Sequence, residues 1–346
     1  VAVTLHAADE MRTWYEFAPR ADAAPGVLSM HDWLEKPAGA HGRVTRNGAH
    51  LEYNGRRMVL WGLNLCYSAC APERQLAERR ARFYPQYGIN TVRLHKYADG
   101  PGWAGIQSAR SFVAFDPQKL DAMDYQVAQF KRQGIYVLLS STFGVKLGPD
   151  DKQRVPYMNE FGGGRREERV QTGHGSIYLS RELQELQIEQ VVNLLMHTNP
   201  YTALTYAQDP AIVCVELFNE DSALFFGTMK VMQTVPTLRT RAAQQFSVWL
   251  RARYGSEAAL RKAWGPRALN SFGNEGFANE SLAAGTIVPA GNPWFYDPDQ
   301  LAGSQSNKVA RLHDTMLFWY EVQNAFYRRY VAAIRKTGYT GEILAS

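Results

Sequence analysis

Residues 211–221 read AIVCVELFNED, a short apolar run that ends in an amide and two acids. The run follows Asp209 and Pro210, and the residue before a proline is pushed out of the α region. A run rich in β-branched residues behind such a breaker is typical of a strand covered on both faces. An α/β barrel carries its chemistry at the carboxyl ends of such strands. We expect a carboxylic acid there to be desolvated, which raises its pKa toward the range of a general acid. An ordinary strand exit with a solvated glutamate is the alternative.

Length and composition place the chain among globular proteins. Its 346 residues suffice for one large barrel or two average domains, and 45% of them are apolar and 21% charged. The net charge of +5 is mild, and the tightest basic cluster, at residues 165–169, is interleaved with glutamates. No apolar run approaches the roughly 20 residues that span a bilayer. We therefore expect neither a nucleic-acid nor a membrane partner. Three cysteines, an odd and sparse set, predict buried free thiols instead of a disulfide framework.

The amino-terminal part divides into two stretches. Residues 1–42 contain several prolines and glycines and are predicted to form an irregular wrap. Residues 43–64 alternate between apolar and polar positions and contain Asn-Gly steps at 47–48 and 54–55. Because Asn-Gly is a strong hairpin-turn signal, this stretch predicts a small β-meander that leads into a buried strand at about 58–64.

Strands and helices then alternate. Further strands are predicted at 89–95, 135–140, 211–217 and 341–346, and helices with apolar periodicity at 72–87, 116–133, 179–195, 246–254, 256–264 and 306–336. This order predicts a parallel sheet with right-handed crossovers. A doubly wound sheet would usually carry a glycine-rich phosphate loop after its first strand, and residues 61–66 lack that spacing. We therefore predict a TIM barrel, (β/α)8, over residues 43–346, with only about the first five βα units in this chain.

Two long segments, 142–178 and 266–305, interrupt this alternation without clear periodicity. Loops of that length in a compact domain are usually functional. They predict either the walls of a pocket or a contact between copies in a homo-oligomer.

Polar residues on two predicted strands are the candidates for chemistry. Arg93 and His95 are two residues apart and share a face, as do Glu216, Phe218 and nominally Glu220. If that face is the barrel interior, Arg93 lies among carboxylates and keeps them ionised and oriented. For Glu216 we favour a satisfied ion pair with Arg93, because buried charges are paired as a rule. His95 could equally be a hydrogen-bonded core imidazole.

The order of these features resembles the clan A glycoside hydrolases, such as cellulase-like family 5 and the β-galactosidases of family 42. Three motifs carry the resemblance: an NG…WGLN entry at 54–64, NTVRLH at 90–95, and ELFNE at 216–220, at the end of the fourth strand. Residues 246–265 are similar to the segment that follows the acid/base residue in family 42. The resemblance covers about residues 43–265.

This resemblance implies a retaining hydrolase of a β-linked glycoside or polysaccharide that uses no cofactor and no metal. Glu220 would be the general acid/base, and Asn219 would hydrogen-bond the sugar 2-hydroxyl. Arg93 would orient the nucleophile and His95 would line the same subsite. Aromatic residues near strand ends would stack on sugar faces: Trp61, Tyr97, Trp103 and Phe143.

The second carboxylate of such a mechanism has no position in this sequence. A retaining glycosidase needs it about 5–5.5 Å from the first, and the resemblance puts it at the end of strand seven. Glu342 would lie at the start of strand five, which is the wrong end. Five strands of eight would also leave open edges. We therefore expect the rest of the barrel to come from a longer polypeptide or a second segment.

Two other functions stay open. One is a catalytically inactive barrel that binds a glycan. The other is a different barrel enzyme, such as a polysaccharide lyase or a metal-dependent hydrolase, although no His/Asp ligand cluster supports it. A chain that starts at Val1 is consistent with a removed signal peptide, and we expect a secreted or periplasmic protein.

Overall fold

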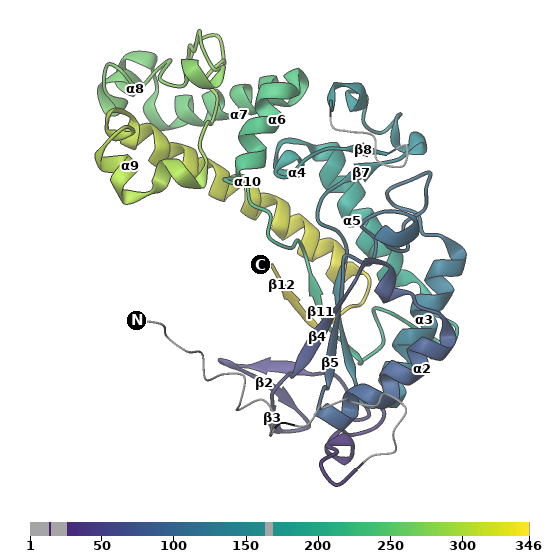
Figure 1. The fold of residues 1–346 in the computed structure, drawn as a ribbon. Coiled ribbons are helices and arrows are strands. Elements are labelled where there is room, and N and C mark those ends of the chain that lie inside the picture. Colours follow the sequence, from purple (N-terminus) through teal and green to yellow (C-terminus); the bar gives the residue numbers. More distant parts are fainter. Residues whose placement is uncertain (1–13, 15–25, 163–168, 346) are drawn as a thin grey trace, which may run out of the picture.

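The computed structural model describes residues 14, 26–162 and 169–345. Most of the predicted wrap at 1–42, the charged residues 163–168 and Ser346 lie outside this part. Five parallel strands form the central sheet in the order β12-β11-β6-β5-β4 (Figure 1). They are β4 (Gly62–Cys66), β5 (Thr91–His95), β6 (Tyr136–Ser140), β11 (Ile212–Glu216) and β12 (Glu342–Leu344). The predicted parallel α/β architecture is confirmed, and closure into a barrel stays a prediction.

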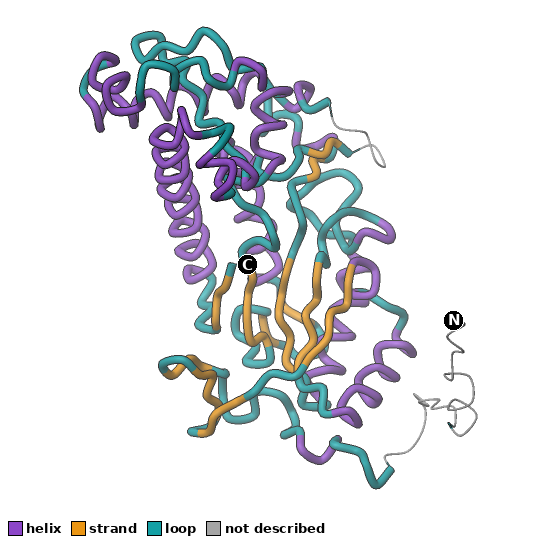
Figure 2. Tube along the Cα trace, turned by 60° about the vertical axis from the view of Figure 1, so that its left-hand side comes forward, coloured by secondary structure: helices purple, strands orange, loops and turns teal. Residues whose placement is uncertain are grey.

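The crossover helices lie on one face of this sheet (Figure 2). They are α2 (Arg74–Phe83), α3 (Pro117–Arg132) and α5 (Arg181–Met196). The predicted start of α3 is confirmed, because the Asp116 side chain accepts hydrogen bonds from the backbone N–H groups of Gln118 and Lys119, each at 3.0 Å. Alternate strand residues such as Val92, Leu94 and Val215 are buried in the main core, which includes residues of these helices. The opposite face carries the polar candidates.

A three-stranded antiparallel sheet lies near the amino ends of the parallel strands. It consists of β1 (Thr45–Asn47), β2 (His50–Tyr53) and β3 (Arg56–Met58), so the predicted meander is confirmed. Its apolar side chains pack on a second core that contains Tyr136, Val213 and Cys214. The predicted single strand at 58–64 is wrong in its bounds, because β3 ends at Met58 and β4 starts only at Gly62.

The long segment 142–178 is built from short elements. These are β7 (Lys146–Leu147) paired with β8 (Val170–Gln171), the 3-10 helices η6 (Pro149–Asp151) and η7 (Met158–Glu160), and α4 (Ser176–Leu179). Other short elements are η2 (His31–Trp33), η3 (Tyr67–Cys70), η4 (Tyr84–Tyr87), η5 (Gly102–Ala104), β9 (Thr198–Asn199) and β10 (Leu204–Thr205).

A group of helices lies beyond the carboxyl ends of the strands (Figures 1 and 2). We call residues 226–308 the helical extension. It contains α6 (Phe226–Thr234), α7 (Pro236–Tyr254), α8 (Glu257–Trp264), η8 (Gly273–Glu275), η9 (Pro293–Tyr296), α9 (Pro298–Ala302) and η10 (Ser306–Lys308). The long helix α10 (Val309–Lys336) leads from this group back to β12.

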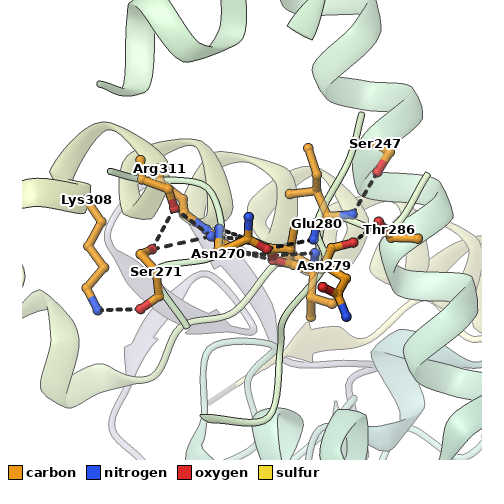
Figure 3. A network of polar contacts seen from close by, with 12 residues as sticks. Ser247, Asn270, Ser271, Asn279, Glu280, Thr286, Lys308 and Arg311 are labelled. Carbon is orange, nitrogen blue, oxygen red and sulfur yellow. Dashed lines mark hydrogen bonds and ion pairs between the residues drawn. The ribbon is translucent and has the colours of Figure 1, made fainter. Parts of the chain in front are cut away.

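The predicted loop at 266–305 is ordered by apolar residues that pack in the main core, such as Phe272 and Ile287, and by a network of polar contacts. The fully buried Arg311 of α10 donates to both carboxylate oxygens of Glu280, at 2.6 and 2.5 Å (Figure 3). Glu280 also accepts from the backbone N–H of Asn270 at 2.8 Å. The apolar residues of this segment follow no regular repeat, so periodicity in the sequence does not predict its structure.

Candidate active site

The side chain of Arg93, on β5, contacts the last residues of two other strands, β6 and β11, near the carboxyl ends of the central sheet. Its Nη2 donates to Oδ1 of Asn219 at 2.6 Å and also contacts the carboxylate of Glu216 and the Ser140 hydroxyl. Glu216 is 3% exposed. The structure therefore contains the predicted Arg93–Glu216 pair, in which a charge-assisted bond compensates the burial of both groups. The same guanidinium fixes the orientation of the Asn219 amide, whose oxygen accepts this bond.

Glu220 lies in the turn that follows β11 and has an exposed side chain. Its φ is +48°, a left-handed conformation that is uncommon outside glycine. Tyr67 and Lys96, directly after β4 and β5, have φ values of +57° and +58°. Such residues cost about 1–3 kcal/mol each and cluster at functional sites. All three follow parallel strands of the central sheet at their carboxyl ends, which is where an α/β barrel carries its chemistry.

Two sequence-based expectations fail in this turn. The regular alternation ends with β11 at Glu216, and Phe218 is buried in the main core, so it does not share a face with Glu220. Glu220 is also exposed instead of desolvated. The physical reason is the same for both, since the chain leaves the strand and enters a turn before it reaches the second glutamate.

His95 is buried beside Arg93 and its Nδ1 lies 3.1 Å from the Ser140 hydroxyl. Burial lowers the pKa of His95 to about 4, with further lowering by the cations Arg93 and Lys96 and opposition from the carboxylates of Glu216 and Glu220. The imidazole is therefore neutral near neutral pH. His95 is thus a buried, hydrogen-bonded imidazole, and its place beside a sugar subsite stays a prediction.

Asp221 is the buried acid of this turn, and no role was predicted for it from the sequence. Its carboxylate accepts from the backbone N–H of Gly175 at 3.0 Å, and its carbonyl accepts from the Tyr178 hydroxyl at 2.8 Å. At Gly175, where φ is +78°, a Cβ atom would lie 1.9 Å from Oγ1 of Thr228. These contacts tie the turn that carries Glu220 to the segment before α5. Burial raises the pKa of Asp221 to about 7, partly offset by the N–H of Gly175.

We expect Asp221→Asn to change how stability depends on pH. A folded-state pKa near 7, above the ordinary 3.8, means that the stabilising contribution of Asp221 is fully present below pH 4 and is lost as pH rises through 7. Urea unfolding at pH 4.5 and pH 8 measures this loss, which is on the order of a few kcal/mol. The asparagine variant keeps an acceptor for Gly175 and should be less sensitive to pH. Equal pH dependence in both proteins would contradict the assignment.

The predicted aromatic contacts separate into two groups. Trp61 is 66% exposed but precedes β4, so it lies at the amino end of the sheet, away from Glu220. Tyr97 is 1% exposed and packs in the main core, where no sugar can reach it. The structure therefore does not support substrate contacts for Trp61 or Tyr97. Trp103 and Phe143 do line a cavity near the carboxyl ends of the strands.

Other residues near the carboxyl ends of the strands were not predicted from the sequence. Tyr67 and Lys96 line the same cavity, His174 forms part of its wall, and the His174 ring lies 5.9 Å from that of Phe225. The only signal in the sequence is that Lys96 directly follows one predicted strand and that Tyr67 comes three residues after the end of another. Within the described ranges, no group of three or more His, Cys, Asp or Glu side chains could hold a metal ion.

The remaining composition-based expectations concern thiols and membranes. Cys66, Cys70 and Cys214 are free cysteines, and the last two are buried. Burial raises the pKa of the Cys214 thiol to about 12, which makes it unreactive. Among the helices that the structure describes, none is long and apolar enough to cross a membrane.

Comparison with curated proteins finds relatives of one kind. The mannan endo-1,4-beta-mannosidase 3 of Arabidopsis thaliana is 22% identical over 283 residues, 77% of this chain and 65% of that protein. The mannan endo-1,4-beta-mannosidase 5 of Solanum lycopersicum is 26% identical over 199 residues, 54% of this chain and 44% of that protein. The resemblance to clan A glycoside hydrolases is confirmed. The chain spans about half the length of the curated relatives it matches. No family model matches it.

Solved structures give a weaker likeness to proteins of this clan. The endo-1,4-beta-mannanase from Rhizomucor miehei is 17% identical, with 61% of this chain and 58% of that chain covered and a TM-score of 0.41. An endo-1,4-beta-D-mannanase from Thermotoga petrophila RKU-1 is 15% identical, with 83% and 88% covered and a TM-score of 0.36. At these TM-scores the likeness carries no argument about the fold or the site.

Proposed function

We propose that the protein is a retaining glycoside hydrolase that cleaves a β-linked polysaccharide, with Glu220 as general acid/base. The observation that carries this proposal is the Arg93 guanidinium bound to Asn219, directly beside the exposed Glu220. Asn219 is thereby oriented to bond a sugar hydroxyl while Glu220 reaches the glycosidic oxygen. The curated relatives make β-1,4-mannan the first substrate to test. Because mannan is a polymer and polymers of this kind are degraded outside the cell, we propose that the protein is secreted.

The mechanism needs a second carboxylate, and we assign none among the described residues. Glu216 is held by Arg93, and Glu342 lies at the start of β12, where it accepts from the backbone N–H of Arg46 at 3.1 Å. The polar face of the sheet is also partly open, since Asn64 and Leu344 at its two edges are exposed. We propose that additional polypeptide covers this face and contributes the nucleophile.

A catalytically inactive barrel that binds a glycan is the second candidate function. It is favoured by one observation, the engagement of Glu216 with Arg93, which leaves Glu220 without an assigned partner. This candidate predicts affinity for a polysaccharide without cleavage.

The test begins with the intact mass of the purified protein and continues with its incubation with β-1,4-mannan. We expect a mass above 39.0 kDa and new reducing ends. Proton NMR of the first products should show the β anomer, as retention requires. Products with the α anomer would reject retention. Mannan binding without any cleavage of β-linked polysaccharides would replace the proposal with the binding function.

A further inference from the structure

A cavity of about 260 Å³ opens near the carboxyl ends of β4, β5 and β6 and is not used by the proposed chemistry. Its wall comes from the residues that follow these three strands and from the segment around β8. Its lining includes aromatic and charged side chains: Tyr67, Lys96, Asp99, Trp103, Phe143, Lys146 and His174. Cavities at this edge of parallel sheets are the usual ligand sites of α/β proteins.

Aromatic rings form two sides of this cavity. The rings of Tyr67 and Trp103 are 5.1 Å apart, and those of Phe143 and His174 are 4.8 Å apart and perpendicular. Trp103 is 49% exposed, which is high for the largest apolar side chain. A half-exposed aromatic side chain beside a cavity is suited to pack on the apolar C–H face of a sugar ring.

Lys96 supplies a positive charge between these rings. Its Nζ lies 4.1 Å above the Phe143 ring and donates to the Tyr67 hydroxyl at 3.2 Å. Within the described part of the chain, Lys96 has no carboxylate at ion-pair distance. Asp99, which also lines the cavity, is instead paired with Lys146. Its carboxylate accepts hydrogen bonds from the Thr142 hydroxyl at 2.9 Å and from the backbone N–H of Phe143 at 2.8 Å. An ammonium group without a carboxylate, set against rings, attracts an anion that can approach through the cavity.

The cavity is connected to the cluster around Glu220 through residues next to its lining in the chain. Lys96 directly follows His95, and His174 directly precedes Gly175, whose N–H is bonded to Asp221 at 3.0 Å. A glycan with a bond at Glu220 could therefore place a neighbouring sugar unit in the cavity. Nδ1 of His174 is buried without a hydrogen-bond partner among the described residues, as is typical where a bound water or ligand group completes a site.

We propose that this cavity binds an acidic sugar unit of the substrate, one with a carboxylate or sulfate group, through Lys96 and the Tyr67–Trp103 rings. The inference rests on the proposed function and narrows it to an anionic glycan. Lys96 pairs with the anionic group, while the half-exposed side chain of Trp103 packs on the sugar ring. A neutral glycan would leave the charge of Lys96 without a counterpart.

The test measures binding with turnover removed, using calorimetry on the Glu220→Gln variant of the protein. The probes share one backbone and length: a neutral β-1,4-mannohexaose, a β-1,4-mannuronate hexamer and a 6-O-sulfated mannohexaose. We expect at least about tenfold tighter binding of one acidic probe, weakened by added salt. The tighter of the two acidic probes identifies the anionic group. Equal affinity for all three probes would overturn the proposal.

Further variants separate charge from structural damage. In the same Glu220→Gln background, Lys96→Gln should remove the preference for the acidic probe, and Lys96→Arg should keep most of it. Lys262→Gln replaces an exposed lysine on α8 and should keep the preference for the acidic probe fully. A preference that survives in Lys96→Gln would also overturn the proposal. Cleavage of neutral mannan without an acidic preference would reject this inference alone, whereas acidic binding without any cleavage would reject only the proposed hydrolysis.

Discussion

Glu220→Gln is expected to lower kcat/KM of the active protein on a polysaccharide by about 10²- to 10⁴-fold, which is the usual worth of general acid–base catalysis. The substitution keeps the size of the side chain and removes only its proton transfer. The loss corresponds to about 3–5 kcal/mol of transition-state stabilisation. Initial rates of reducing-end release, measured against substrate concentration, give this ratio.

The leaving group provides a sharper form of this experiment. An acid is needed only when the departing oxygen is basic. The loss of kcat/KM should therefore be far smaller for an aryl glycoside with a dinitrophenolate leaving group than for the polysaccharide. A displaced turn would reduce both rates equally. Glu275→Gln, in the helical extension, is the matched control and should retain activity. A loss of less than about tenfold on the polysaccharide would exclude Glu220 as the general acid.

The second large effect concerns stability and lies in the helical extension. Glu280→Gln should lower the free energy of unfolding by about 3–5 kcal/mol, because it leaves the guanidinium of Arg311 buried without its counter-charge. Arg311 also donates to the carbonyls of Ala268 and Val288, at 2.8 and 3.0 Å, so residues 266–290 should lose order with it (Figure 3). Denaturant unfolding together with amide hydrogen exchange over these residues measures both consequences.

Two comparisons test whether the buried charge is the cause. Arg311→Met combined with Glu280→Gln removes both charges and should cost less than the sum of the two single variants. Glu189→Gln breaks an exposed pair with Arg154 and should change stability by less than about 1 kcal/mol. If Glu280→Gln were as harmless as Glu189→Gln, the pair would not be what orders this segment.

Much of the fold followed from local chemistry. Short apolar runs that alternate with helical segments predicted the parallel strands, and the Asp116–Pro117 step predicted where α3 begins. The two-residue repeat of a strand also put Arg93 and His95 on one face, and parallel pairing brought Arg93 to Glu216. The strands, the start of α3 and the shared face of Arg93 and His95 are consequences of short-range geometry. The pair between Arg93 and Glu216 joins residues 123 apart in the sequence and also depended on the order of the strands.

The rest depended on how distant segments pack. Whether an aromatic residue near a strand is open to a sugar depends on which end of the strand it follows and on what covers it, so Trp61 and Tyr97 could not be assigned from sequence. Asp221 is buried where the chain packs against a segment that includes Gly175, 46 residues earlier, whose N–H donates to it. Lys96 faces a cavity only because segments after three strands meet there. The sequence alone determined the parallel strands and the shared face of Arg93 and His95, whereas burial and charge at the site were decided by the tertiary structure, because desolvation depends on neighbours that are remote in the chain.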